Sequence, residues 1–326
     1  MSAATSRKLG PWRVYPIGIG CMNPSWQGGA ALDPKLRQES AIPALHAALD
    51  AGVRLLDTAD IYAPTWRDYG HNELLVREAV DSWSASPSQK AEVVIATKAG
   101  IARRPGEEWG RNSSLDYLLR AAEASAARLG VDKIQLWQHH RQDPTISFEQ
   151  QFENVLVLKE RGIVDQIGVS NYDAKQLEVA VRMGGKPQDG GVISVQNQLS
   201  PRYRHELGVL EVCEKHGIAF LPWSPLGGSH SKAEIAPNSQ TIFEQVGAEL
   251  GLSPYATALA WLLKMSPTMI PIPGPTRVET VADCLTATSV ELTDEQFERI
   301  QANLPKQVDE SEELYPKPPY RDAVNA

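Results

Sequence analysis

The chain has 326 residues, of which 42% are hydrophobic, and its formal net charge at pH 7 is −8. This length and hydrophobic content suit one large core, so we expect a single domain over residues 1–326. The negative charge argues against a nucleic-acid surface, which needs clustered lysine and arginine. No export signal and no apolar stretch of about 18 residues is visible, so we expect a cytoplasmic protein that does not bind a membrane.

The first predicted element is a short hairpin at residues 7–15, where Gly10-Pro11 marks a turn between two short segments. After it, apolar runs alternate with segments of helical period. Most of the runs are short and apolar throughout, as expected for parallel strands that are covered on both faces. They lie at 17–22, 53–57, 93–98, 134–139, 167–170, 192–196, 219–223 and 269–272.

The helical segments are marked by their apolar faces and by their start signals. Apolar residues between 115 and 129 recur at steps of three and four, and a second helix covers 152–159. Capping residues precede five helices, at Asp33, Ser147, Asp173, Ser253 and Thr293.

Eight strands that alternate with helices predict an α/β fold, the (β/α)8 TIM barrel, with the N-terminal β-hairpin covering its N-terminal mouth. A doubly wound sheet is the weaker alternative, because the segment after Gly18 and Gly20 lacks the third glycine of a dinucleotide fingerprint. From about residue 305 the chain is rich in proline and acidic residues, so we expect an irregular tail.

Four ionisable residues follow successive predicted strands, at the barrel end where such folds carry their chemistry. Asp57 and Tyr62 follow the second strand, Lys98 ends the third and His140 follows the fourth. A free phenol has a pKa of about 10, and a nearby ammonium that is held by a carboxylate favours the phenolate. We therefore expect a general acid, with an imidazole that orients the oxygen of a carbonyl group as it becomes an alcohol.

Each of these residues taken alone also has an ordinary structural explanation, and none of the four can supply a hydride. A cofactor must therefore provide it. The adjacent His139 points to the opposite face of its strand, so the two histidines should not share a metal, and we expect no metal site.

The chain resembles the aldo-keto reductase superfamily over nearly its whole length. The motifs that carry the resemblance occur in family order: LLDTADIY at 55–62, GHNELL at 70–75, ATK at 96–98, LWQHHRQDP at 136–144, GVSNY at 168–172, VQNQ at 195–198, WSPLGG at 223–228 and IPGPTR at 272–277. The resemblance implies a barrel that binds NADPH at its C-terminal face. It also implies a catalytic tetrad of Asp57, Tyr62, Lys98 and His140, in which Tyr62 donates the proton.

The same resemblance implies ten cofactor contacts. They run from the nicotinamide carboxamide and ring to the pyrophosphate and the 2′-phosphate: Ser170, Asn171, Gln196, Trp223, Ser224, Leu226, Gly228, Gly274, Thr276 and Arg277. A guanidinium suits a phosphate dianion, so Arg277 favours NADP over NAD. Thr280 and Cys284 depart from the family pattern at the adenosine end. The sequence therefore leaves open how strongly the protein prefers NADPH over NADH.

Three tryptophans in loops at the predicted mouth, Trp26, Trp66 and Trp109, suggest a site for an apolar or planar carbonyl compound. We therefore expect an NADP-dependent oxidoreductase that reversibly reduces an aldehyde or ketone. Two alternatives remain open: a regulatory NADPH-binding module of the same fold, and a Schiff-base aldolase with Lys98 as nucleophile. The sequence names neither the substrate nor the oligomeric state.

Overall fold

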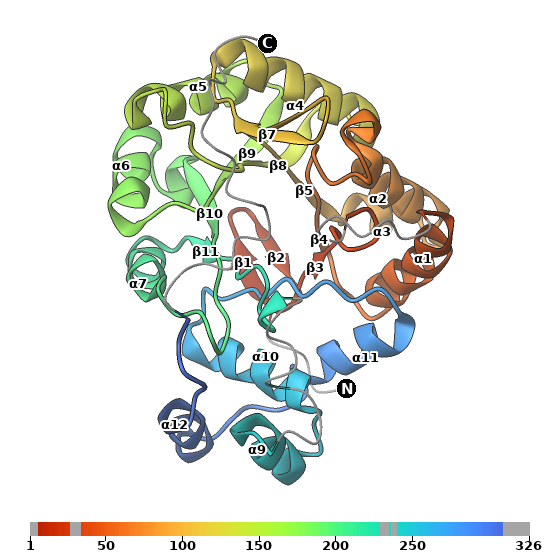
Figure 1. Ribbon diagram of the computed structural model, residues 1–326, viewed down its shortest axis with the longest axis vertical. Helices are drawn as coiled ribbons and strands as arrows, with labels where there is room; N and C mark the ends of the chain where they lie inside the picture. Colours follow the sequence, from red (N-terminus) through yellow and green to blue (C-terminus); the bar gives the residue numbers. More distant parts are fainter. Residues whose placement is uncertain (1–5, 27–33, 229–234, 236–239, 309–326) are drawn as a thin grey trace.

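Seven parallel strands form one curled sheet in the order β11-β10-β9-β8-β5-β4-β3 (Figure 1). The computed structural model describes residues 6–26, 34–228, 235 and 240–308. The strands fall within the predicted runs or overlap them: β3 (Ile19–Gly20), β4 (Leu55–Asp57), β5 (Val94–Ala99), β8 (Ile134–His139), β9 (Val164–Ser170), β10 (Val192–Gln196) and β11 (Ala219–Phe220). Asp33 and most of the expected tail lie outside the described residues.

The eighth predicted strand, 269–272, closes the sheet without forming a regular ladder. On one side the Ile270 amide donates to the Phe220 carbonyl at 2.8 Å; on the other, the Gly18 amide donates to the Pro271 carbonyl at 2.9 Å. Proline has no N–H, so toward β3 residues 271 and 273 can only accept hydrogen bonds. The segment nevertheless joins the two edges of the sheet, and the predicted (β/α)8 barrel is confirmed.

Helices surround the sheet on its outer side (Figure 1). They are α1 (Pro34–Asp50), α2 (His71–Ser82), α3 (Pro87–Ala91), α4 (Leu115–Leu129), α5 (Phe148–Glu160), α6 (Ala174–Gly184), α7 (Leu207–His216), α9 (Ile242–Leu250), α10 (Pro254–Met265), α11 (Val278–Thr286) and α12 (Asp294–Ala302). The predicted caps Ser147, Asp173, Ser253 and Thr293 each accept a hydrogen bond from a backbone amide three residues ahead. Among the described helices, none is long and apolar enough to cross a membrane.

The predicted N-terminal hairpin is present and fills the barrel from one end. β1 (Arg7–Leu9) and β2 (Trp12–Val14) pair antiparallel. Leu9 and Val14 pack with the inward-facing residues of the strands in one apolar cluster. Gly10 forms the turn at φ 55°, and a Cβ there would lie 2.7 Å from Ile193 Cδ1, so this tight fit requires glycine.

A second hairpin, which the sequence pattern did not predict, follows β5. β6 (Ile101–Arg104) and β7 (Glu108–Arg111) pair antiparallel. Both strands are short, both carry charged residues, and neither contains an apolar run. This hairpin lies beside the loop after β4, and that loop carries Tyr62.

Candidate active site

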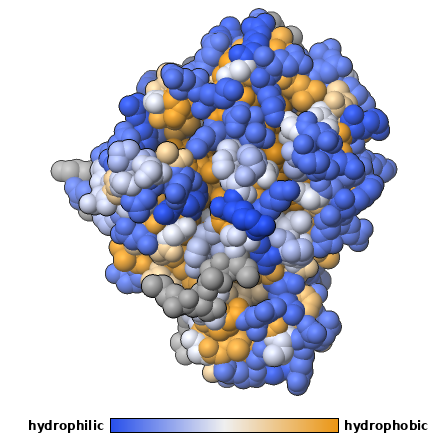
Figure 2. Space-filling model, turned by 180° about the vertical axis from the view of Figure 1, so that it is seen from behind, coloured by the Kyte–Doolittle hydropathy of each residue, from blue (hydrophilic) through white to orange (hydrophobic). Residues whose placement is uncertain are grey.

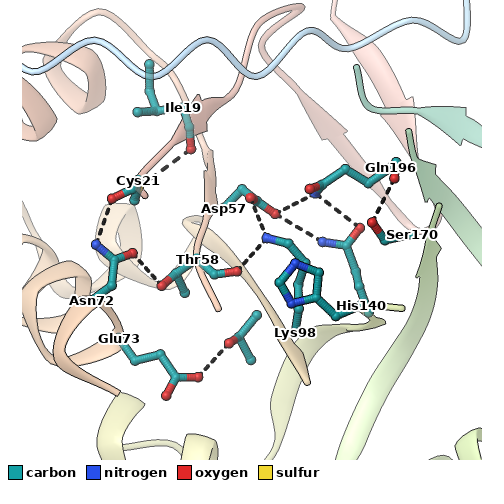
Figure 3. A network of polar contacts seen from close by, with 12 residues as sticks. Ile19, Cys21, Asp57, Thr58, Asn72, Glu73, Lys98, His140, Ser170 and Gln196 are labelled. Atoms are coloured by element: carbon teal, nitrogen blue, oxygen red, sulfur yellow. Dashed lines mark hydrogen bonds and ion pairs between the residues drawn. The ribbon is translucent and has the colours of Figure 1, made fainter. Parts of the chain in front are cut away.

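A buried ion pair lies at the centre of the site (Figure 3). Lys98 Nζ is 2.7 Å from Asp57 Oδ2 and also donates to the Thr58 carbonyl at 2.7 Å. The Lys98 side chain is fully buried. Buried charges need further hydrogen bonds to offset the loss of water. Asp57 Oδ1 receives two, from Gln138 Nε2 at 3.0 Å and from Gln196 Nε2 at 2.7 Å.

Tyr62 and His140 complete the predicted tetrad around this pair. Lys98 Nζ lies 4.8 Å from the centre of the Tyr62 ring. The Tyr62 and His140 rings are 5.8 Å apart and nearly perpendicular, at 84°. The structure therefore brings together the four residues from β4, the loop after it, β5 and the end of β8.

His140 is held as a neutral imidazole. Burial is the main cause that lowers its pKa well below the usual value, and the positive charges of Lys98, Arg141 and Arg111 lower it further. A neutral imidazole has one N–H donor and one acceptor. His140 can therefore donate one hydrogen bond to an oxygen in the cavity.

His139 faces the other side of β8, as predicted. Its Nε2 is 2.8 Å from Ser113 Oγ, and its Nδ1 is 2.8 Å from the Tyr172 hydroxyl. Burial lowers the pKa of His139 to about 4. No group of potential metal ligands occurs among the described residues.

An elongated cavity of about 760 Å³ extends from the tetrad to α11. Asp57, Tyr62 and His140 line it at one end, while Lys98 lies beneath its wall. All ten residues that the family resemblance assigned to the cofactor line this cavity: Ser170, Asn171, Gln196, Trp223, Ser224, Leu226, Gly228, Gly274, Thr276 and Arg277. Tyr255 and Asp283 line it too, on helices where no local signal marked them.

Asn171 connects three parts of the cavity wall. Its Nδ2 donates to the His140 carbonyl at 3.0 Å and to Ser170 Oγ at 2.8 Å, and its Oδ1 accepts from Trp223 Nε1 at 3.2 Å. The residue has φ 59°, a left-handed backbone conformation that asparagine adopts more readily than most other residues.

The three predicted substrate tryptophans occupy different positions. Trp26 lines the cavity beside the tetrad. Trp109 packs behind it with ring centres 5.8 Å apart. Trp66 is half-buried in a short 3-10 helix and stacks on the Arg67 guanidinium at 4.4 Å. Trp66 and Trp109 are not among the described residues that line the cavity.

Sequence reasoning missed Gln138, which contacts Asp57 directly. A signal was available, because residues two apart on a strand share a face. Gln138 therefore had to lie on the same face as His140.

Comparison with known proteins adds an independent line of evidence. The sequence model of a protein family, described as the Aldo/keto reductase family, matches residues 16–304 of this chain. An uncharacterized oxidoreductase from Schizosaccharomyces pombe is 32% identical and covers 92% of this chain and 90% of its own length. Another protein of that yeast, the NADP(+) aldo-keto reductase yakc, is 27% identical, with coverage of 89% and 88%. The solved structure of an aldo-keto reductase from Klebsiella pneumoniae in complex with NADPH has a TM-score of 0.71 at 22% identity, with coverage of 93% and 96%.

Proposed function

The chain belongs to the aldo/keto reductase family, and from this premise we propose that it reversibly reduces an aldehyde or ketone to an alcohol with NADPH. One observation carries the proposal. Tyr62 and His140 line one end of the cavity together with Asp57, and the Lys98 ammonium that pairs with Asp57 lies 4.8 Å from the centre of the Tyr62 ring.

Each residue of the tetrad has a distinct part in this proposal. Tyr62 donates its hydroxyl proton to the carbonyl oxygen, and the nearby Lys98 ammonium stabilises the negative charge left on the phenol oxygen. Asp57 holds Lys98 in place through their 2.7 Å contact. The neutral His140 donates a hydrogen bond to the same substrate oxygen and orients it.

The cavity suits an extended nicotinamide cofactor, which supplies the hydride when bound. Gln196 uses its Nε2 on Asp57, so its Oε1 is the end that can accept from a carboxamide N–H. The Trp223 indole is fixed by its hydrogen bond to Asn171 and offers a face for stacking. Arg277 and Thr276 lie at the far end, where a guanidinium can bind a phosphate dianion. The NADP(+) in the name of the yeast relative and the NADPH in the Klebsiella structure support this assignment.

The substrate end favours a small apolar or planar carbonyl compound, because Trp26 forms its wall. Trp109 would act only through its packing on Trp26. Trp66 contributes nothing to this proposal.

The two alternatives receive less support. A Schiff-base aldolase needs a free amine at the cavity surface, whereas Lys98 is buried and its Nζ already contacts Asp57 and Thr58. A purely regulatory module needs no proton donor, yet Tyr62 lies beside both Lys98 and His140.

The proposal is tested by Tyr62→Phe, which removes only the hydroxyl. General acid catalysis contributes a factor of about 10² to 10⁴, so we expect kcat for an aromatic aldehyde to fall by that factor. The affinity for NADPH, measured by fluorescence titration, should stay within about twofold. The matched control is Tyr15→Phe, whose hydroxyl contacts Thr288 away from the cavity, and it should keep the wild-type kcat. Wild-type turnover by Tyr62→Phe would contradict the proposal.

A further inference from the structure

Gln138 is a buried polar residue in the barrel interior that the proposed reaction does not use directly. It lies on β8 between Leu136 and His140, on the inward face, and its exposed fraction is 0%. Its amide donates from Nε2 to Asp57 Oδ1 at 3.0 Å, and its Oε1 lies 3.5 Å from Gln196 Nε2. It thus lies between the Asp57 carboxylate and Gln196, which lines the cavity.

The Asp57 carboxylate fixes the orientation of both glutamine amides. An ionised carboxylate only accepts hydrogen bonds, so the amide atoms that face Asp57 Oδ1 must be nitrogens. Gln138 and Gln196 both donate to this one oxygen, while Lys98 approaches the other oxygen. The carboxylate therefore has its two oxygens assigned to different partners (Figure 3).

The neighbouring strands leave room for the Gln138 side chain. On β9, a Cβ at Gly168 would lie 2.9 Å from Gln138 Cγ, closer than such atoms approach in proteins. On β10, the small side chain of Ser194 lies at the same level. The space that this amide occupies depends on the absence of a side chain at residue 168.

A buried amide stabilises a fold less than an apolar side chain of the same size, unless its hydrogen bonds are made. Val94, Leu136, Ile193 and Leu221 belong to an apolar cluster inside the same barrel. Gln138 is retained among them with both ends of its amide in contact with functional residues. Its contribution therefore lies in the positions of Asp57 and Gln196, which its amide contacts.

We propose that Gln138 is a positioning residue for the reduction. It holds the Asp57 carboxylate in the orientation in which one oxygen meets Lys98 and the other meets Gln196. In this way it sets the ammonium beneath Tyr62 and keeps the Gln196 amide turned toward the cavity. This inference rests on the proposed function and adds a residue to its machinery.

The first test replaces the amide with a side chain of similar length, Gln138→Met. A hydrogen bond to a charged group is lost, so we expect kcat at pH 7 to fall about tenfold to hundredfold with a smaller change in KM for the aldehyde. The matched control is Gln135→Met on the same strand, which removes a hydrogen bond to the Ile95 amide instead. That control should keep the wild-type kcat.

The second test uses Gln138→Glu and the pH dependence of kcat, which a merely space-filling role would not alter. At neutral pH the new carboxylate faces Asp57, and kcat should fall. At lower pH one of the two carboxyls is protonated and can donate to the other. We therefore expect kcat of Gln138→Glu to recover toward the wild-type value as the pH falls, whereas kcat of Gln138→Met should not recover.

Wild-type kcat and pH profile in both variants would overturn the inference while leaving the proposed function intact. An inactive wild-type protein would instead overturn the proposed function. A crystal structure of Gln138→Met then decides the positioning role by itself. An Asp57 carboxylate turned away from Lys98 or Gln196 would support that role, and an unchanged carboxylate would overturn it.

Discussion

The residues near the site show how burial selects a protonation state. Burial and nearby cations disfavour the charged form of His140, so its pKa lies well below the usual value. Asp60 is a second case. Burial, followed by the charge of Glu73, raises its pKa well above the usual value. Its Oδ1 has no hydrogen-bond partner among the described residues.

A raised pKa makes Asp60 a source of pH-dependent instability. The folded protein keeps a proton that the unfolded chain releases above its pKa of about 3.9, so stability falls as the pH rises from there toward the folded pKa. Asp60→Asn removes this cost. We expect its free energy of unfolding in urea to exceed that of the wild type at about pH 8, and the difference to shrink toward pH 4.

The exposed Asp132→Asn serves as the control and should leave the pH dependence of unfolding unchanged. If Asp60→Asn were less stable than the wild type at the higher pH, the carboxyl would have to be ionised and paired, contrary to this account.

At the residue scale, the sequence predicted that four ionisable residues meet because each follows or ends an apolar strand. The structure brings all four together, and their catalytic roles remain predictions. The ten cofactor positions came from the family resemblance, and their roles remain predictions. Trp66 could not be placed from sequence, because nothing local shows which way a loop side chain turns. Gln138 could have been found from its two-residue spacing to His140.

At the element scale, the hairpin of β6 and β7 is attached to the loop that carries Tyr62. Arg103 on β6 donates to the Ala63 carbonyl at 2.7 Å and to the Pro64 carbonyl at 3.1 Å. It also pairs with Glu107 at 2.6 Å and lies 4.8 Å from the Trp109 ring centre. One side chain thus joins the hairpin to the residues just after Tyr62.

Arg103→Met should loosen the loop at residues 61–64 while leaving the rest of the cavity wall unchanged. Because the position of Tyr62 is less well defined, we expect kcat to fall about tenfold, with NADPH affinity unchanged. Hydrogen exchange at residues 61–64 should become faster. Arg104→Met, on the adjacent residue of β6, is the matched control. Equal kcat and equal exchange in the two variants would contradict the role given to Arg103.

Strands and helices were predicted where a single signal ran through the whole element. The apolar runs marked the buried parallel strands, and the caps Asp173 and Thr293 marked the starts of α6 and α12. The β6–β7 hairpin was missed because five of its eight strand residues are charged or glycine. Its stability comes from contacts with a distant loop, which no local pattern shows.

At the scale of the whole molecule, the barrel brings residues far apart in the chain to one end and closes the other. The β1–β2 hairpin fills the N-terminal end with Leu9 and Val14, and the segment 269–272 joins β11 to β3. The alternation of strands and helices was enough to predict this architecture. The irregular hydrogen bonding at the closure was not predictable, although Pro271 and Pro273 are its cause.

The proposed reaction transfers hydride from NADPH to a carbonyl carbon, and an isotope label follows that hydride into the product. The protein is incubated with an aromatic aldehyde and NADPH that carries deuterium at the transferable C4 position, and the product is analysed by mass spectrometry. We expect an alcohol with one deuterium on the former carbonyl carbon. An alcohol without deuterium, or no alcohol from a panel of aldehydes and ketones, would contradict it.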